Sequence, residues 1–331
     1  MTGVAGGAAR YWTQENDTVH CSLCPHSCKI IPGASGRCGV RWNRDGQMTL
    51  PYYGKASALG SDPIEKKPLY HFHPGAQILS IGFLGCNFRC PFCQNYSISQ
   101  STDRATVYVA PDDLVSRAKG EGSFGIAYTY NEPSVHFEYV MDAAARAHDA
   151  GLKNVLVTNG HLNQDPAREL LALMDAANID LKSYSDTFYR REIGGFVSAV
   201  LEFIKLATRL CHVEITTLVI PGKNNSEKEL EEMSKFVASL DPNIPYHLSA
   251  YYPTYHYTYE ATTSAEIDSA LAIARKHLNF VYPGNLPGPA VTACSSCGNI
   301  LIERRGYRVN LPGITNGKCS SCGEPVPIVL D

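Results

Sequence analysis

Residues 77–97 read QILSIGFLGCNFRCPFCQNYS, an apolar run followed at once by three cysteines in a short loop. The run has the length and composition of a buried strand. The loop places Cys86, Cys90 and Cys93 at spacings of three and two intervening residues, and its glycine and proline allow a compact turn. Four cysteines usually hold a [4Fe–4S] cluster, so three would leave one iron open to a small molecule.

The alternative is a closed site in which a distant side chain supplies a fourth ligand to a zinc ion or an electron-transfer cluster. Cys211 is one candidate, but it begins a later apolar run. It would therefore lie at the amino end of a parallel sheet, whereas the three-cysteine loop lies at the carboxyl end. His71 and His73 are nearer in sequence and are not excluded by this argument.

From about residue 76 the sequence alternates short apolar runs with amphipathic segments, which is typical of parallel βαβ units. Because parallel strands need right-handed helical crossovers, six such units predict an α/β fold, either a partial (β/α)6 barrel of the TIM type or an open doubly wound sheet, and we expect the barrel. Capping-box spacings, Ser226 with Glu229 and Thr263 with Glu266, mark two helix starts. The predicted strands are residues 77–84, 124–130, 153–158, 178–182, 212–220 and 246–251.

Cysteine-rich segments flank the predicted barrel on both sides. We therefore divide the chain into an N-terminal cysteine-rich module (1–75), the barrel (76–289) and a C-terminal module similar to a zinc ribbon (290–331). The N-terminal cysteines lie in a stretch rich in glycine and proline, which predicts irregular loops around a metal. A structural zinc and a second [4Fe–4S] cluster both fit these four cysteines, and we favour zinc. They are Cys21, Cys24, Cys28 and Cys38.

The C-terminal cysteines form two Cys-x2-Cys-Gly pairs separated by 21 residues. Two such knuckles suit tetrahedral zinc, and iron of the rubredoxin kind is the alternative. In either case the site is closed, so we expect a structural role. The four residues are Cys294, Cys297, Cys319 and Cys322.

The composition limits the class of protein. An apolar fraction of 44% and a charged fraction of 18% indicate a globular chain with a large core. The net charge of −3 gives no broad electrostatic footprint for nucleic acid, and no export signal or long apolar run is found, so we expect a cytoplasmic protein without a membrane partner. In a reducing compartment, twelve cysteines indicate metal binding rather than disulfides.

The segment CNFRCPFC, with Phe92 before its last cysteine, resembles the C-x3-C-x-aromatic-C signature of radical S-adenosylmethionine (SAM) enzymes. The resemblance covers about residues 77–285. Within that superfamily the chain resembles the group related to glycyl-radical-enzyme activases, and most closely the AmmeMemoRadiSam system family. The supporting segments are CSLCPHSC, GRCGVRWN, YTYNEP, TNGHL, DLKSYSDTFYR, TLVIPGKNNS, VYPGN and the terminal CSSCG pair.

This resemblance implies an enzyme of the oxidoreductase or lyase type that uses a [4Fe–4S] cluster and SAM. Reductive cleavage of SAM would yield a 5′-deoxyadenosyl radical, which would take hydrogen from a substrate that the resemblance does not identify. It also implies a low-potential electron donor of the flavodoxin or ferredoxin type, with companion proteins of the AmmeMemo type.

Polar residues at the strand ends are candidates for binding SAM. Tyr130, Asn131 and Glu132 stand where related activases have Gly-Gly-Glu, a segment that meets the methionine amino group in that family. Loss of the glycines removes backbone freedom, so the contact is expected to differ here. Glu132 could instead cap or salt-bridge the following helix.

Two further strand ends carry candidate SAM contacts, in addition to the aromatic Phe92. Asp180 and Lys182 resemble an Asp-hydrophobic-Lys segment whose lysine approaches the methionine carboxylate in activases, and a structural Asp–Lys pair is the alternative. Asn159 could bond ribose hydroxyls, although Asn-Gly is equally a common turn. The tyrosine-rich segment 251–259 could line a substrate pocket or pack over the barrel mouth.

Two rival functions remain at this point. A non-enzymatic metal-binding adaptor would explain the two outer cysteine groups. An activase acting on a partner protein would explain the three-cysteine loop, but the interval from Cys93 to the second predicted strand is too short for the ferredoxin-like insertion usual in activases.

Overall fold

The computed structural model describes residues 8–330. The first seven residues, where an export signal was sought, and the last residue of the predicted C-terminal module lie outside the described range. Within that range no helix has the length and apolar character needed to cross a bilayer.

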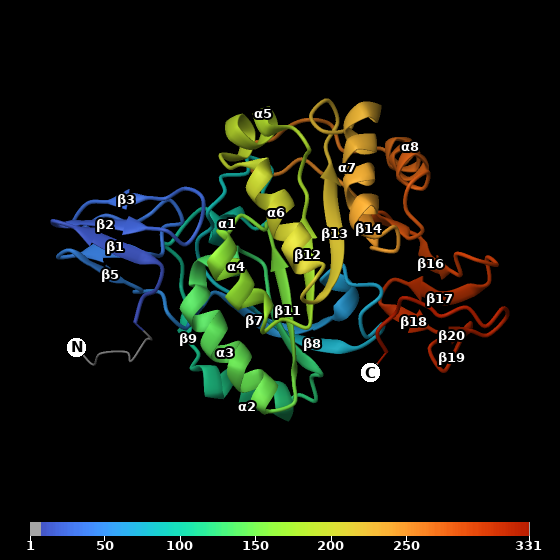
Figure 1. The fold of residues 1–331 in the computed structure, drawn as a ribbon, viewed down its shortest axis with the longest axis horizontal. Helices are drawn as coiled ribbons and strands as arrows, with labels where there is room; N and C mark the ends of the chain where they lie inside the picture. Colours follow the sequence, from blue (N-terminus) through green and yellow to red (C-terminus); the bar gives the residue numbers. More distant parts are fainter. Residues whose placement is uncertain (1–7, 331) are drawn as a thin grey trace.

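A central sheet of eight strands organises the chain, in the order β15-β14-β13-β12-β11-β10-β8-β7 (Figure 1). The neighbours from β8 to β15 are parallel, and β7 pairs antiparallel with β8 at one edge. The bounds are β7 Ala58–Pro63, β8 Gln77–Gly82, β10 Gly125–Tyr128, β11 Lys153–Thr158, β12 Ala176–Asp180, β13 His212–Val219, β14 Tyr246–Ala250 and β15 Val281–Gly284.

The predicted α/β fold with a parallel sheet is confirmed, and each of the six predicted strands is present. Sequence reasoning missed the two edge strands. β15 is short and contains Pro283, which an edge strand tolerates because it lacks one neighbour. β7 contains Gly60 and Pro63 and shows no alternation of apolar residues, so it gave no strand signal. The central sheet thus begins at Ala58.

Helices follow the parallel strands and pack in pairs, α2 with α3, α3 with α4, α4 with α6, and α7 with α8 (Figure 1). The predicted helix starts are confirmed, because Ser226 and Thr263 each accept a hydrogen bond from the N–H three residues on. The bounds are α1 Tyr96–Ser99, α2 Pro111–Gly120, α3 Phe137–Asp149, α4 Gln164–Leu171, α5 Asp186–Phe188, α6 Val197–Ala207, α7 Glu227–Leu240 and α8 Ser264–Ala274. Short 3-10 segments η1 Ile64–Lys66 and η2 Pro133–His136 and the π-helical η3 Tyr189–Ile193 complete the set.

The cysteine-rich ends form small antiparallel sheets on opposite sides of the central sheet (Figure 1). The N-terminal end was expected to be irregular, but backbone pairing organises much of it. Its strands are β1 Trp12–Glu15, β2 Thr18–Cys21, β3 Lys29–Ile30, β4 Trp42–Arg44, β5 Gln47–Thr49 and β6 Lys55–Ala56, the last paired with β9 Val107–Tyr108. The C-terminal strands are β16 Pro289–Ala293, β17 Ile300–Arg305, β18 Arg308–Asn310, β19 Ile314–Thr315 and β20 Lys318–Cys319.

A buried ion pair links the N-terminal sheets to helix α3. Arg41 Nη1 lies 2.8 Å from Glu138 Oε2 on α3, and the two side chains are 1% and 4% exposed. The same carboxylate accepts the backbone N–H of Arg10 at 2.8 Å. Because both charges are buried, each depends on the other.

We expect Glu138→Gln to lower the free energy of unfolding by about 3–5 kcal/mol, because it leaves the Arg41 charge buried without a counter-ion. The matched control is Glu202→Gln on α6, which breaks the exposed pair with Lys205 and should cost less than about 1 kcal/mol. Urea unfolding of both variants measures the difference. Equal losses would contradict the anchoring role of the buried pair.

Candidate active site

The three-cysteine loop follows β8 at the carboxyl edge of the parallel sheet. Cys86 and Cys90 are buried and Cys93 is partly exposed. All three line one cavity of about 350 Å³, within the size range of small-molecule sites. The sequence-predicted residues Phe92, Tyr130, Asn131, Glu132, Asn159, Asp180 and Lys182 line the same cavity.

The side chain of Asn131 and the carbonyl group of Cys38 hold the start of this loop in place. Asn131 accepts the N–H of Phe83 at 3.1 Å and donates to the carbonyl of Gly85 at 2.8 Å. Gly85 has a φ of +83°, and a Cβ there would lie 2.4 Å from the carbonyl oxygen of Cys38. Only glycine fits this turn, both because of its conformation and because of the close approach. The side chain of Asn131 therefore positions the loop, which sequence reasoning did not foresee.

A chain of amides supports Cys86 from the end of β11. Asn159 donates to Oδ1 of Asn87 at 2.8 Å and lies 3.7 Å from the sulfur of Cys86, while its Oδ1 accepts the N–H of His161. Asn87 in turn donates to the carbonyl of His161 at 2.8 Å. Asn159 thus lines the cavity and also stabilises its own turn.

Glu132 is buried at the end of β10 and accepts three hydrogen bonds. Its donors are the N–H of Ser134 at 3.0 Å, the hydroxyl of Thr158 at 2.7 Å and the N–H of Asn159 at 2.8 Å. Burial raises the pKa of the carboxyl, and these donors oppose the shift. Glu132 therefore caps η2, as the structural alternative predicted, and ties the end of β10 to the end of β11.

Tyr130 keeps a backbone conformation that favours glycine, with φ of +73°. Such a conformation costs a non-glycine residue about 1–3 kcal/mol. The tyrosine hydroxyl donates to Asp62, and Lys67 Nζ lies 4.6 Å from the ring centre and 2.7 Å from Asp62 Oδ2. These contacts offset the strain.

Asp180 and Lys182 form the ion pair that was the structural alternative to a SAM contact, with Lys182 Nζ 2.7 Å from Asp180 Oδ2. Burial opposes the charge on Lys182, but Asp180 and then Cys90 outweigh it and raise the lysine pKa. Conversely, burial raises the pKa of Cys90 to about 12, and Lys182 acts in the opposite direction. Burial also raises the pKa of Cys86. Metal binding must therefore displace protons from these two thiols.

The tyrosine-rich segment packs over the cysteine loop and does not line the cavity. The N–H groups of His256 and Tyr257 donate to the carbonyl of Pro91 at 2.9 and 3.1 Å. The ring of Tyr257 lies 5.5 Å from that of Phe92. The packing role considered for this segment thus accounts for its contacts.

The side chains proposed as fourth ligands lie elsewhere. Cys211 precedes β13 at the amino end, with its sulfur 3.7 Å from the carbonyl of Ala207. His71 contacts the hydroxyl of Tyr282 at 2.6 Å and the carbonyl of Pro327 at 2.9 Å. Within residues 8–330, the cavity is lined by no fourth cysteine and by no histidine.

Sequence reasoning missed several residues of the cavity wall. Lys66 and Lys67 reach it from the segment after β7, a strand that was not predicted. Thr216 on β13 and Ser249 on β14 also line the cavity, and each is one of several polar residues in its strand. Asn285 follows β15.

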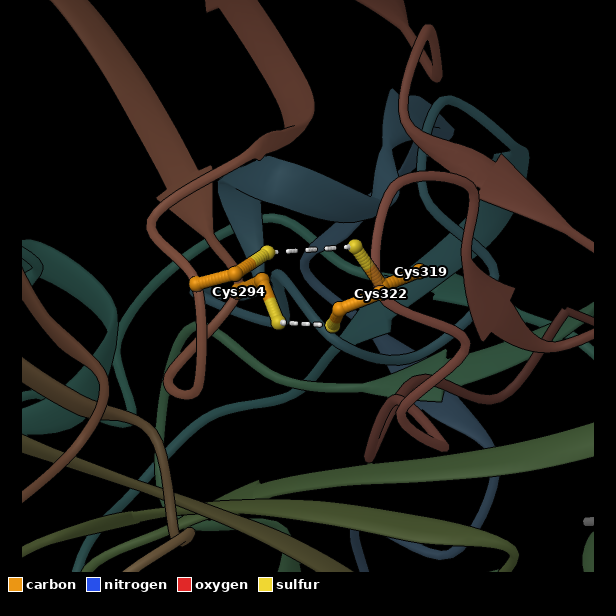
Figure 2. Close-up of side chains that lie close together, drawn as sticks. Cys294, Cys319 and Cys322 are labelled. Carbon is orange, nitrogen blue, oxygen red and sulfur yellow. Dashed lines mark hydrogen bonds between the residues drawn. The ribbon is translucent and has the colours of Figure 1, made fainter.

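The C-terminal cysteines form a compact tetrad that could bind a metal (Figure 2). The sulfurs of Cys294 and Cys322 are 3.7 Å apart, as are those of Cys297 and Cys319. Zinc–thiolate bonds of about 2.3 Å in a tetrahedron give edges of about 3.8 Å. Among the described residues, this is the one group of three or more Cys, His, Asp or Glu whose ligand atoms all lie within 4.8 Å of one another.

Comparison with known proteins identifies the family. The model of the radical SAM superfamily matches residues 80–237. The uncharacterized protein MJ0808 of Methanocaldococcus jannaschii is 38% identical over 302 residues, which cover 89% of this chain and 90% of that protein. The 4-hydroxyphenylacetate decarboxylase activating enzyme of Clostridium scatologenes is 22% identical over 153 residues, or 44% of this chain and 48% of that enzyme.

A solved structure shares the fold. SuiB of Streptococcus suis, in the crystal structure bound to S-adenosylmethionine, superposes with a TM-score of 0.52 at 15% identity, covering 63% of this chain and 52% of SuiB. At that identity the likeness concerns the fold alone. The matched family model and the extended similarity to MJ0808, together with the three thiols that line one cavity, show that the chain belongs to the radical SAM superfamily.

Proposed function

We propose that this chain cleaves SAM reductively at a [4Fe–4S] cluster bound by Cys86, Cys90 and Cys93, and that it abstracts hydrogen from a substrate. The observation that supports this function is that three thiols, and no fourth cysteine or histidine among residues 8–330, line one cavity. Such a donor set fits a cluster with one iron left for a small molecule. The cluster and SAM together supply the 5′-deoxyadenosyl radical.

In this proposal, residues of the chain bind and orient SAM and shield the cavity from water. Lys182 is the cation for the methionine carboxylate, held in place by Asp180. Glu132 and the backbone around Tyr130 and Asn131 receive the methionine amino group. Phe92 and Asn159 line the side of the cavity next to the cysteines, where burial excludes water.

We propose that the electron that reduces the cluster comes from a low-potential protein of the flavodoxin or ferredoxin type. We also propose that the chain belongs to the AmmeMemoRadiSam group within the superfamily and works with companions of that type, on the strength of the segments quoted above. The substrate is not assigned.

We expect anaerobically reconstituted protein with dithionite to convert SAM into 5′-deoxyadenosine and methionine. Cys90→Ala should abolish this conversion, because it removes one of three thiolates that hold the cluster. Cys211→Ala is the matched control, since that thiol lies away from the cavity, and it should retain the activity. Chromatographic quantification of 5′-deoxyadenosine is the measurement. Undiminished cleavage by Cys90→Ala would refute the assignment, and no cleavage by the wild type would favour an adaptor.

Lys182→Met should weaken SAM binding roughly ten- to a hundredfold, since a charge-assisted hydrogen bond contributes about 1.5–3 kcal/mol. Glu132→Gln is expected to have an effect of the same size. Lys205→Met is the control, because Lys205 is an exposed residue of α6. Equilibrium binding of SAM measures the effect, with iron content determined in parallel.

Two outcomes would count against these SAM contacts. Wild-type affinity in Lys182→Met and Glu132→Gln would leave both residues with structural roles only. Loss of iron from Glu132→Gln would assign that carboxylate to the support of the cysteine loop.

We further propose that the C-terminal tetrad holds a structural metal, zinc or iron. The buried core of this module is small, consisting of two cysteines with Leu301 and Ile302, so metal must contribute to its stability. Residues 290–331 expressed alone should fold only when zinc is added, as followed by circular dichroism, and Cys319→Ser should not respond. A fragment that folds equally well without metal would overturn this expectation.

A further inference from the structure

The four N-terminal cysteines converge on one place in the fold. Cys21 ends β2, and its N–H donates to the carbonyl of Cys28 at 2.9 Å, which closes the loop that carries Cys24. The N–H of Arg37 donates to the sulfur of Cys28 at 3.4 Å, which brings the loop carrying Cys38 to the same point. These contacts bring the four cysteines into one part of the fold.

The spacing of these thiols differs from that of the C-terminal tetrad. Among residues 8–330, the C-terminal tetrad is the group whose ligand atoms gather at the spacing of a single tetrahedral ion, and the N-terminal cysteines do not form such a group. A [4Fe–4S] cluster binds each thiolate to a different iron, so its thiolates lie farther apart than those around one ion. Cys86, Cys90 and Cys93 likewise do not form such a group. In this respect the N-terminal cysteines resemble the three thiols proposed to hold the catalytic cluster and differ from the C-terminal tetrad.

The N-terminal group also contacts the catalytic loop directly. The carbonyl oxygen of Asn87 lies 2.8 Å from His26 Nε2 and accepts a hydrogen bond from Arg37 Nε at 3.3 Å. Arg89 donates to the carbonyl of Arg37 in the opposite direction. The carbonyl of Cys38 lies so close to Gly85 that a Cβ on that glycine would be 2.4 Å away. Cys38 is therefore in van der Waals contact with the residue before Cys86.

From these contacts we infer that Cys21, Cys24, Cys28 and Cys38 hold a second [4Fe–4S] cluster, closed by four thiolates, through which electrons enter the catalytic site. Four thiolates occupy every iron, so no position remains for SAM or substrate. Two of the four N-terminal thiols, Cys24 and Cys28, are partly exposed, so a donor protein can approach the N-terminal cluster from solvent.

The proposed transfer moves one electron and makes or breaks no bond. A low-potential one-electron donor protein is oxidised, and the N-terminal cluster is reduced from the 2+ to the 1+ state. It then returns to 2+ as the catalytic cluster takes the electron. No proton is needed, because the thiolates stay bound to iron throughout.

The test uses the full chain with Cys86, Cys90 and Cys93 all changed to alanine, reconstituted anaerobically. We expect about four acid-labile sulfides per chain to remain, and about eight in the wild type. Sulfide is the decisive count, because neither zinc nor a single iron in the C-terminal tetrad carries any. This readout does not depend on SAM cleavage, so it can fail independently of the proposed function.

The electron paramagnetic spectrum tests whether the remaining cluster is closed. Dithionite should give the triple variant a one-electron signal that added SAM leaves unchanged, and Cys211→Ser in the same background should keep both the signal and the sulfide. Zinc in place of sulfide in a folded triple variant would overturn the inference, with folding checked by circular dichroism. A signal that shifts with SAM would also overturn it, because an iron would then be open.

Discussion

The bonds from the Asn131 side chain to the backbone of Phe83 and Gly85 set the position of the cysteine loop, and the site depends on that position. A loop of eight residues that presents three thiols to one cavity cannot rely on its own hydrogen bonds. It is held from β10 through Asn131, from β11 through Asn159, and from the N-terminal sheets through the carbonyl of Cys38. Each support comes from a different element, so the loop is fixed only in the folded chain.

The architecture was predictable because its signals are local. A buried parallel strand is a short apolar run, and Ser226 or Thr263 marks a helix start with a bond that spans three residues. The carboxyl ends of parallel strands share one edge, so Cys86, Glu132 and Lys182 could be placed at one cavity before any contact was known. The edge strands gave weaker signals, because β7 contains Gly60 and lacks an alternation of apolar residues, and β15 contains Pro283.

What could not be predicted rests on contacts between distant segments. Asp62 and Lys67 precede the cysteine loop by some twenty residues and meet Tyr130 only because β7 folds back along β8. Likewise, the spacing of cysteines along the sequence does not distinguish a site for a single metal ion from a site for a [4Fe–4S] cluster. That distinction depends on how far apart the sulfurs of Cys21 and Cys38 are held, which the backbone pairing of the N-terminal sheets decides.

The most direct test of the central claim is whether SAM coordinates the iron that the three cysteines leave open. Electron–nuclear double resonance on the reduced chain, with SAM carrying nitrogen-15 in its methionine amino group, measures this contact. The account predicts a hyperfine coupling between that nitrogen and the cluster spin, lost in the variant that lacks Cys86, Cys90 and Cys93. A reduced cluster in the wild type with SAM bound but no such coupling would contradict it.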